Sequence, residues 1–203
     1  MKLRGLYAIT PDIADRSTLH HLVDEALKGG IAALQYRRKS LTPSLRLDEA
    51  RVLAARCRAK GVPFIVNDDL DLAIVVEADG VHLGREDGDL AAARAKLPGK
   101  LLGASCYDSL ERARAAVVAG ADYVAFGSVF LSPTKPAAVR APHTLFAEAK
   151  PLGVPLVAIG GITLENTPRL LQAGADCVAV VSDLFDAPDV AARARAYGKL
   201  FER

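Results

Sequence analysis

The chain has 203 residues, 51% of them hydrophobic, and its 26 basic and 24 acidic residues leave a formal net charge of +2. This balance argues against nucleic acid or a membrane surface as the main partner, because no basic stripe is present to meet either. The amino terminus lacks the apolar core of a signal peptide, and no apolar run of ~20 residues could span a bilayer. The three cysteines are widely separated and fit neither a disulfide framework nor a zinc site. We therefore expect a cytoplasmic enzyme or binding protein.

Short apolar or β-branched runs alternate with longer segments of helical period along the chain. The expected strands cover residues 6–10, 32–36, 64–67, 80–83, 101–105, 123–127, 156–160 and 177–182. The expected helices cover 17–29, 44–60, 108–119, 163–173 and 187–202, with a less regular pattern at 69–77, 88–96 and 142–150. Eight strands, each followed by a helix, predict an α/β fold, a (β/α)8 TIM barrel. Because such barrels typically take ~250 residues, we expect short loops and a single domain over residues 1–203.

A weak internal repeat supports this count of eight units. Segments 29–34, 78–83, 119–124 and 173–178 each join a small or glycine-containing helix end to an apolar strand. All four fall at even-numbered strands, as a barrel built from βαβα quarters would show. Glycine at helix ends occurs in any α/β chain, so an open doubly wound sheet remains the alternative.

Polar residues gather where the expected strands end. In a (β/α)8 barrel, the carboxyl ends of the strands converge on one face, which is where catalysis occurs in this fold. The residues at these ends are Gln35, Arg37, Lys39, Asn67, Asp68, Asp69, Gly84, Arg85, Glu86, Asp87, Ser105, residues 127–135, Gly160, Gly161, Val181 and Ser182.

Cations follow the second and sixth expected strands. Arg37, Lys39 and Lys135 suit a polyphosphate, because arginine offers a planar fork and lysine a point charge. Arg38 alternates away from Arg37, and a solvated surface position is the competing interpretation for it.

Two carboxylates follow neighbouring strands. Asp68 and Asp87 could lie close together at the barrel mouth, and two carboxylates with phosphate oxygens and waters are the usual environment of Mg2+. General acid–base pairing is the competing functional interpretation, and capping of the third or fourth helix is the structural one. Asp69, Asp71 and Asp89 are expected to be caps or surface groups.

The last three loops offer a phosphate site. Loops after strands seven and eight commonly bind phosphate in barrels through backbone N–H groups, although Gly160-Gly161 would also suit a tight turn. The segment 127–136 is rich in hydroxyls and suits a lid over phosphate or, alternatively, a surface turn. Thr163 is expected to cap the following helix.

The sequence gives weaker support for a role of three further residues. His82 lies within an expected strand and is interpreted as structural. Tyr7 and Thr10, on the first strand, could contact a flat ring.

Taken together, these residues resemble the thiamine-phosphate synthase family over essentially the whole chain. The matching segments are Leu6-Tyr7-Ala8-Ile9-Thr10, Gln35-Tyr36-Arg37-Arg38-Lys39, Asn67-Asp68, Gly80-Val81-His82-Leu83-Gly84 with Glu86-Asp87, Gly103-Ala104-Ser105, Ala121-Asp122-Tyr123-Val124, Ser132-Pro133-Thr134-Lys135, Ala158-Ile159-Gly160-Gly161-Ile162 and Val181-Ser182. The order and spacing of these segments make the match specific.

The resemblance implies a transferase of thiamine biosynthesis. It would condense 4-amino-2-methyl-5-(diphosphomethyl)pyrimidine with a thiazole phosphate, giving thiamine phosphate and pyrophosphate, with one Mg2+ ion per site. By resemblance, the pyrimidine diphosphate would be held by Gln35, Arg37, Lys39, Asn67, Ser105 and Lys135, and the metal by Asp68 and Asp87. The thiazole phosphate would be held by Ser132, Thr134, Gly161, Val181 and Ser182. Tyr36, Arg38 and Pro133 are counted with the substrate site as parts of the same motifs, and Arg37, Lys39, Ser105 and Lys135 are the expected catalytic groups.

The chain departs from the family pattern at several positions. Asp69 stands where the family usually has arginine, Arg85 where it usually has glutamine, and Asp183 where a small apolar residue is common. The alternatives are a thiazole tautomerase of the same fold, a barrel isomerase acting on a phosphosugar, and a non-catalytic thiamine-phosphate-binding homologue. Asp68 and Asp87 favour the synthase, and the sequence leaves a homo-oligomer open.

Overall fold

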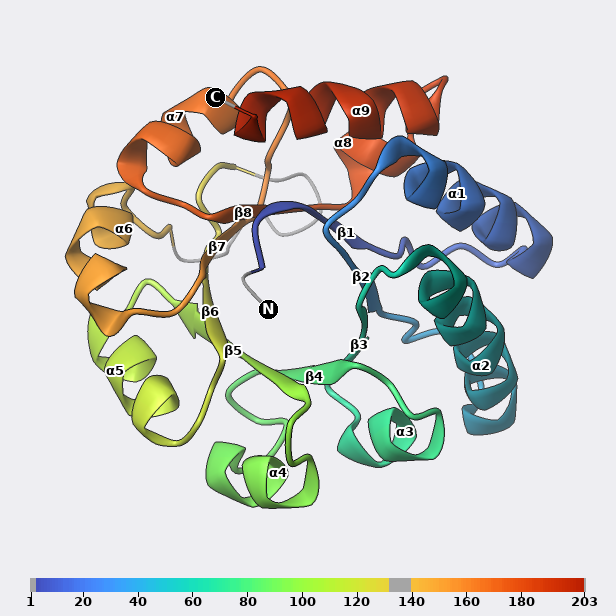
Figure 1. Ribbon diagram of the computed structural model, residues 1–203, viewed down its shortest axis with the longest axis horizontal. Coiled ribbons are helices and arrows are strands. Elements are labelled where there is room, and N and C mark those ends of the chain that lie inside the picture. Colours follow the sequence, from blue (N-terminus) through green and yellow to red (C-terminus); the bar gives the residue numbers. More distant parts are fainter. Residues whose placement is uncertain (1–2, 132–139, 203) are drawn as a thin grey trace.

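The computed structural model describes residues 3–131 and 140–202, and its strands form a closed parallel barrel in sequence order (Figure 1). The strands are β1 (Gly5–Ile9), β2 (Ala33–Tyr36), β3 (Phe64–Asn67), β4 (Gly80–Leu83), β5 (Leu101–Tyr107), β6 (Tyr123–Phe126), β7 (Leu156–Ile159) and β8 (Cys177–Val180). Because β1 pairs with β8 as well as with β2, the sheet has no free edge. The TIM barrel predicted from the sequence is confirmed, and the open doubly wound sheet is excluded.

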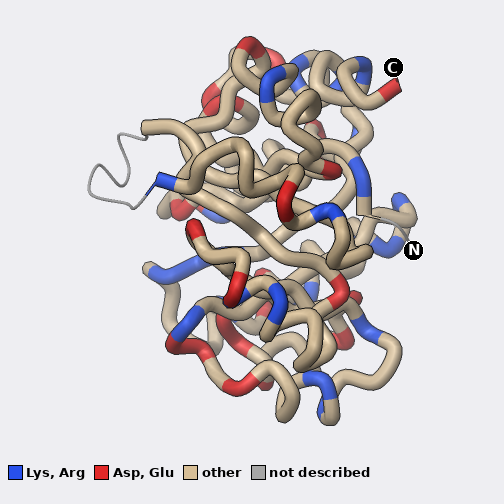
Figure 2. Tube along the Cα trace, turned by 90° about the vertical axis from the view of Figure 1, so that its left-hand side faces the viewer, with Lys and Arg blue, Asp and Glu red and all other residues tan. Residues whose placement is uncertain are grey.

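The helices form a ring outside the strands (Figure 1). They are α1 (Arg16–Gly29), α2 (Pro43–Lys60), α3 (Leu70–Val75), α4 (Leu90–Lys96), α5 (Leu110–Val118), α6 (Thr144–Ala149), α7 (Thr167–Ala173), α8 (Ser182–Phe185) and α9 (Val190–Phe201), with a 3-10 turn over Lys150–Leu152. None of the helices in the described ranges is long and apolar enough to cross a membrane. Positions of both charge signs are interspersed along the trace (Figure 2), as the nearly balanced composition predicts.

Among the boundaries that differ from those expected, two lie in the β7–α8 region, and local hydrogen bonds explain one of them. Helix α7 begins at Thr167 instead of residue 163, because Thr163 and Asn166 close a turn in front of it. The Thr163 backbone N–H donates to Asn166 Oδ1 at 2.9 Å, and the Asn166 N–H donates to Thr163 Oγ1 at 3.3 Å. The eighth strand ends at Val180, and the short helix α8 follows from Ser182.

Side chains of the strands alternate between two apolar cores. One core lies between the strands and the helices, and the other fills the barrel interior. The interior core comprises Leu3, Tyr7, Ile9, Ala33, Ile65, Tyr123, Ala125, Val157, Cys177 and Ala179. The barrel is therefore a packed solid and not a pore, as the fold requires.

A chain of hydrogen bonds crosses the barrel interior. Gln35 Nε2 donates to Tyr7 Oη at 3.0 Å, and Tyr7 Oη lies 2.8 Å from Tyr123 Oη. Tyr123 Oη lies 3.1 Å from His82 Nδ1, and His82 Nε2 lies 2.9 Å from Ser105 Oγ. Burying a polar group costs free energy unless the group is hydrogen-bonded. This series of hydrogen bonds therefore restricts each of its side chains to one position.

Gly103 makes this arrangement sterically feasible. A Cβ at Gly103 would lie 2.1 Å from Tyr123 Cζ and 2.5 Å from His82 Nδ1. The His82 and Tyr123 rings stack with centroids 5.5 Å apart. The interpretation of His82 as a structural barrel residue agrees with its burial and its two hydrogen bonds.

Burial lowers the pKa of His82 to about 4, although the charge of Asp87 opposes this shift. The unfolded chain therefore binds more protons than the folded one between about pH 4 and 6.5, and the free energy of unfolding falls as the pH drops through this window. Between pH 7 and pH 5 we expect His82 to account for a loss of about 2 kcal/mol. Urea unfolding at pH 7 and pH 5 measures this change. The free energy of unfolding should fall less between the two pH values in the His82→Gln variant than in the wild type. An equal fall in both proteins would contradict a neutral His82.

Candidate active site

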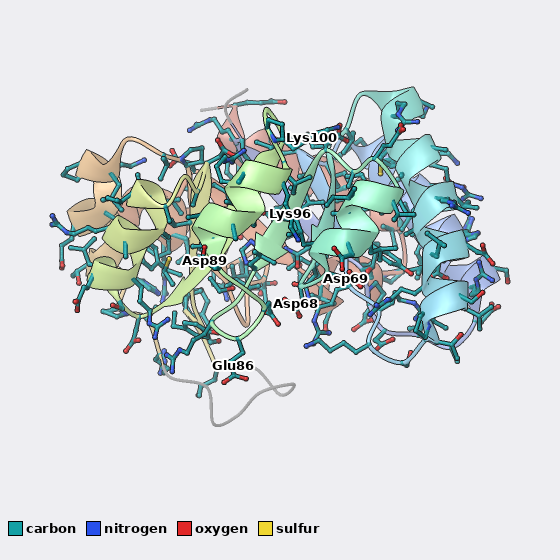
Figure 3. All side chains as sticks on the ribbon, turned by 90° about the horizontal axis from the view of Figure 1, so that it is seen from below. Asp68, Asp69, Glu86, Asp89, Lys96 and Lys100 are labelled. Atoms are coloured by element: carbon teal, nitrogen blue, oxygen red, sulfur yellow. The ribbon has the colours of Figure 1, made fainter. Side chains whose placement is uncertain are left out.

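The carboxyl ends of the strands share one end of the barrel. Figure 3 shows Asp68, Asp69 and Glu86 toward this end and Lys100 at the other, as expected from their places after β3, after β4 and before β5. A pocket of about 410 Å³ opens beside β3, and its lining includes Lys39, Asn67, Asp68 and Asp87. Residues from three separate loops therefore line one cavity, whereas Gln35, Arg37, Ser105 and Gly161 are not among its lining residues.

Asp68 occupies an unusual backbone conformation at the end of β3. Its φ of 64° is left-handed, a region that aspartate tolerates better than most residues. Its N–H donates to the His82 carbonyl at 2.9 Å, which attaches the turn to β4. The Asp68 carboxylate lies 3.3 Å from Lys39 Nζ. Asp69, and not Asp68, caps α3 by accepting from the Leu72 N–H at 2.9 Å.

Asp87 folds back onto its own loop. Its Oδ2 accepts from the Gly84 N–H at 2.9 Å, and a Cβ at Gly84 would lie 2.6 Å from the same oxygen. Asp89, and not Asp87, caps α4 through the Ala92 N–H. Partial burial and the neighbouring Asp68 carboxylate raise the pKa of Asp87, against the opposing effects of Gly84 and Lys39. The two carboxylates are therefore close to each other, and neither serves as a helix cap.

This carboxylate pair has the chemistry of a magnesium site. Mg2+ prefers hard oxygen ligands and relieves the repulsion between adjacent carboxylates. Within residues 3–131 and 140–202, no group of three or more His, Cys, Asp or Glu side chains could hold a metal. Asp68 and Asp87 would therefore need phosphate oxygens and waters to complete the coordination, which is the usual arrangement for this ion.

Thr10 fixes the backbone from which the site cations extend. Its hydroxyl donates to the Arg37 carbonyl at 3.0 Å and accepts from the Arg37 N–H at 2.8 Å. Arg37 is half-buried and Lys39 is exposed. The Thr10 hydroxyl thus connects the ends of β1 and β2 and is not presented to a flat ring. Tyr7 is buried in the barrel interior, where it accepts from Gln35.

The predicted surface position of Arg38 is wrong. Its side chain is fully buried, and its Nε lies 2.8 Å from Glu49 Oε2 on α2. Tyr36 donates to the same oxygen at 3.0 Å, and Arg16 lies 3.3 Å from Glu49 Oε1. Tyr36 and Arg38 therefore lie between the barrel wall and α2, where they order the β2–α2 segment. Strand alternation correctly separated Arg38 from Arg37, but it could not reveal a buried partner 11 residues away.

The hydrogen-bonded chain ends at two predicted site residues, Gln35 and Ser105. Their polar groups are fixed through Tyr7, Tyr123 and His82. Sequence analysis did not assign Tyr123 a role. The only available signal was a tyrosine inside an apolar strand, and its partners depend on the strand register.

The loops after β6, β7 and β8 also meet at this end. Gly160 and Gly161 have φ values of 105° and 62°, which side chains rarely adopt. A Cβ at Gly160 would lie 2.1 Å from Ser128 Oγ, and one at Gly161 would lie 2.4 Å from the Leu131 carbonyl oxygen. Both glycines are therefore needed for close packing of the β7 loop on the β6 loop.

The remaining expected site residues lie after β8 and in the segment after β6. Val181 is half-buried and Ser182 is exposed, directly after β8. The expected site residues Ser132, Pro133, Thr134 and Lys135 lie outside the described residues.

Two departures from the family pattern have local explanations. Besides capping α3, Asp69 pairs with Arg46 at 2.5 Å. The Arg85 guanidinium lies over the Tyr107 ring, 5.1 Å from its centroid, in a cation–π contact.

Comparison with known proteins agrees with this geometry. The model of one protein family, described as Thiamine monophosphate synthase, matches residues 6–184. A protein of Aromatoleum aromaticum named Thiamine-phosphate synthase is 61% identical over 99% of this chain and 98% of its own length. A protein of the same name from Chromobacterium violaceum is 56% identical over 98% and 97% of the two chains.

A solved structure gives the same result. Thiamine phosphate pyrophosphorylase from Pyrococcus furiosus superimposes with a TM-score of 0.85 at 35% identity, covering 99% of this chain and 96% of that one. The likeness thus extends over nearly the whole length of both chains. The chain belongs to the thiamine monophosphate synthase family.

Proposed function

We propose that the protein is a thiamine-phosphate synthase that joins a pyrimidine methyl diphosphate to a thiazole phosphate and releases pyrophosphate. The observation that carries this proposal is the meeting of Lys39, Asp68 and Asp87 in one pocket, in a chain 61% identical to a Thiamine-phosphate synthase. A cation beside paired carboxylates suits a diphosphate that binds together with Mg2+.

In this reaction, the bond between the pyrimidine methylene carbon and the diphosphate oxygen breaks, and its electron pair leaves with the diphosphate. The thiazole nitrogen then donates its lone pair to the methylene carbon, forming the new C–N bond. No proton needs to be moved, so the enzyme needs neither a general base nor a protein nucleophile. Its task is to stabilise charge and to orient the two substrates.

The leaving diphosphate is the centre of charge development. Arg37 and Lys39 extend from the end of β2, and their positive charges would stabilise the growing negative charge on the diphosphate. Asp68 and Asp87 would hold Mg2+, which when bound supplies further positive charge to the leaving group.

The pyrimidine ring would lie above the hydrogen-bonded chain. Gln35 and Ser105 are the ends of that chain, so their polar groups are oriented before the substrate arrives. Such preorganisation avoids a reorganisation cost during the reaction. The packed interior below would exclude water, which would otherwise quench a pyrimidine methylene cation.

The thiazole phosphate would bind at the loops after β7 and β8. Their backbone includes Gly160 and Gly161, whose positive φ values shape the turn from which backbone N–H groups would meet the anion. The two substrates would then lie side by side at the mouth, one above β2–β5 and the other at β7–β8.

The direct test is incubation of the purified protein with both substrates, with Mg2+ and with EDTA. The proposal predicts thiamine phosphate and pyrophosphate in equal amounts, formed only with the metal. Absence of both products in the presence of Mg2+ would reject the proposed activity.

Asp68→Asn and Asp87→Asn should each lower kcat by about 100-fold or more, because each removes a charged metal ligand while preserving shape. Titration with Mg2+ should show a higher metal requirement in both variants. Asp69→Asn is the matched control, since Asp69 adjoins Asp68 but caps α3 and should affect stability instead of metal dependence. Unchanged activity in both site variants would defeat the metal assignment.

Lys39→Ala should raise the KM for the pyrimidine diphosphate and lower kcat, together reducing kcat/KM by about 100-fold, because a charge-assisted contact to the leaving group is lost. The KM for the thiazole phosphate should stay unchanged. Lys100→Ala, at the opposite end of the barrel (Figure 3), is the matched control for removing a lysine. Steady-state kinetics with each substrate varied in turn would expose the difference, and identical kinetics in the two variants would contradict the role of Lys39.

A further inference from the structure

Asp183, at the barrel mouth, accepts hydrogen bonds from three other residues. It follows Ser182 in α8, and only 18% of its side chain is exposed. Arg193 Nη1 donates to both carboxylate oxygens at 3.0 Å, Tyr197 Oη donates at 2.7 Å, and the Leu164 N–H donates at 3.2 Å. A small apolar side chain at this position could make none of these hydrogen bonds.

These contacts connect three parts of the fold. Leu164 lies in the loop between β7 and α7, three residues beyond Gly161. Arg193 and Tyr197 lie one turn apart on α9, which packs against α1 and β1. One carboxylate therefore ties the β7 loop and the start of α8 to a helix anchored on the barrel wall.

The opposite side of the β7 loop is held independently. Asn166 Nδ2 donates to the Gly161 carbonyl at 3.0 Å, and Thr167 Oγ1 donates to the Thr163 carbonyl at 2.7 Å. The loop is thus braced by α7 on one side and by Asp183 on the other. Removing Asp183 would free only the side that faces β8.

Tyr197 provides a steady donor for this contact. Its ring is fully buried, and burial together with the Asp183 carboxylate raises the pKa of Tyr197 well above its usual range. The phenol therefore remains protonated near neutral pH and donates to Asp183.

We propose that Asp183 is a positioning residue that sets the separation of the β7 and β8 loops and thereby determines affinity for the thiazole phosphate. This inference rests on the proposed function, which places that phosphate at the two loops. Backbone donors bind an anion best when they are held in place beforehand, because loop ordering then costs no binding energy. The pyrimidine diphosphate, bound above β2–β5, should be indifferent to the change.

The test is steady-state kinetics of Asp183→Ala and Asp183→Asn with each substrate varied in turn. The KM for the thiazole phosphate should rise about 10-fold in Asp183→Ala and less in Asp183→Asn, while the KM for the pyrimidine diphosphate stays within about twofold. Amide hydrogen exchange should show faster exchange at Leu164 in Asp183→Ala than in the wild type.

Asp176→Asn is the matched control. Asp176 also accepts a backbone N–H, from Leu156 at 3.0 Å, and pairs with Lys150 at 2.9 Å, but it precedes β8 at the opposite end of the barrel. Its loss should lower the melting temperature without changing either KM. Where Asp183→Ala does not fold, Tyr197→Phe removes one hydrogen bond and should raise the KM for the thiazole phosphate alone by about twofold to threefold.

The possible results separate the inference from the proposed function. A wild-type enzyme that forms thiamine phosphate, with both KM values unchanged in the Asp183 variants, overturns the role of Asp183 and leaves the activity intact. Equal changes in both KM values, or the same effect in Asp176→Asn, would mean that Asp183 contributes only to the general stability of the protein. Either result would also overturn the proposed role. A wild-type protein without turnover rejects the proposed function, and the inference falls with it.

Discussion

The closed register of the parallel barrel is the constraint on which the site depends. Each strand pairs with its neighbours in one direction, so every loop that follows a strand leaves at the same end. The pairing of Ile9 with Gln35 and of Asn67 with His82 fixes how far each strand end extends toward the mouth. Lys39, Asp68 and Asp87 come from three different loops and thereby line one pocket, although no short-range interaction would bring them together.

The series of hydrogen bonds in the barrel interior orients two of the predicted site residues, Gln35 and Ser105. An apolar interior would pack equally well, but it would leave Gln35 and Ser105 without fixed partners. The chain through Tyr7, Tyr123 and His82 satisfies these polar groups and makes them interdependent. The same contacts that satisfy these buried polar atoms therefore also fix where the Gln35 and Ser105 side chains point.

The predictable part of the molecule is the part set by local pattern. Short apolar runs between segments of helical period located all eight strands, and Asp69 and Asp89, expected to be caps or surface groups, both cap helices. Distant partners could not be predicted. The burial of Arg38 depends on Glu49, which α2 brings beneath it, and the role of Asp183 depends on α9. The short helix α8 was missed because its four residues are too few to show a period.

The central claim is that loops from separate strands surround a single diphosphate and metal site. Crystals grown with pyrophosphate and Mn2+, a spectroscopic substitute for Mg2+, would test it through the anomalous scattering of manganese. The account predicts one manganese peak contacted by the Asp68 and Asp87 carboxylates, with the pyrophosphate between this ion and the Arg37 and Lys39 side chains. Manganese and pyrophosphate bound at any other part of the molecule, with this pocket holding neither, would contradict it.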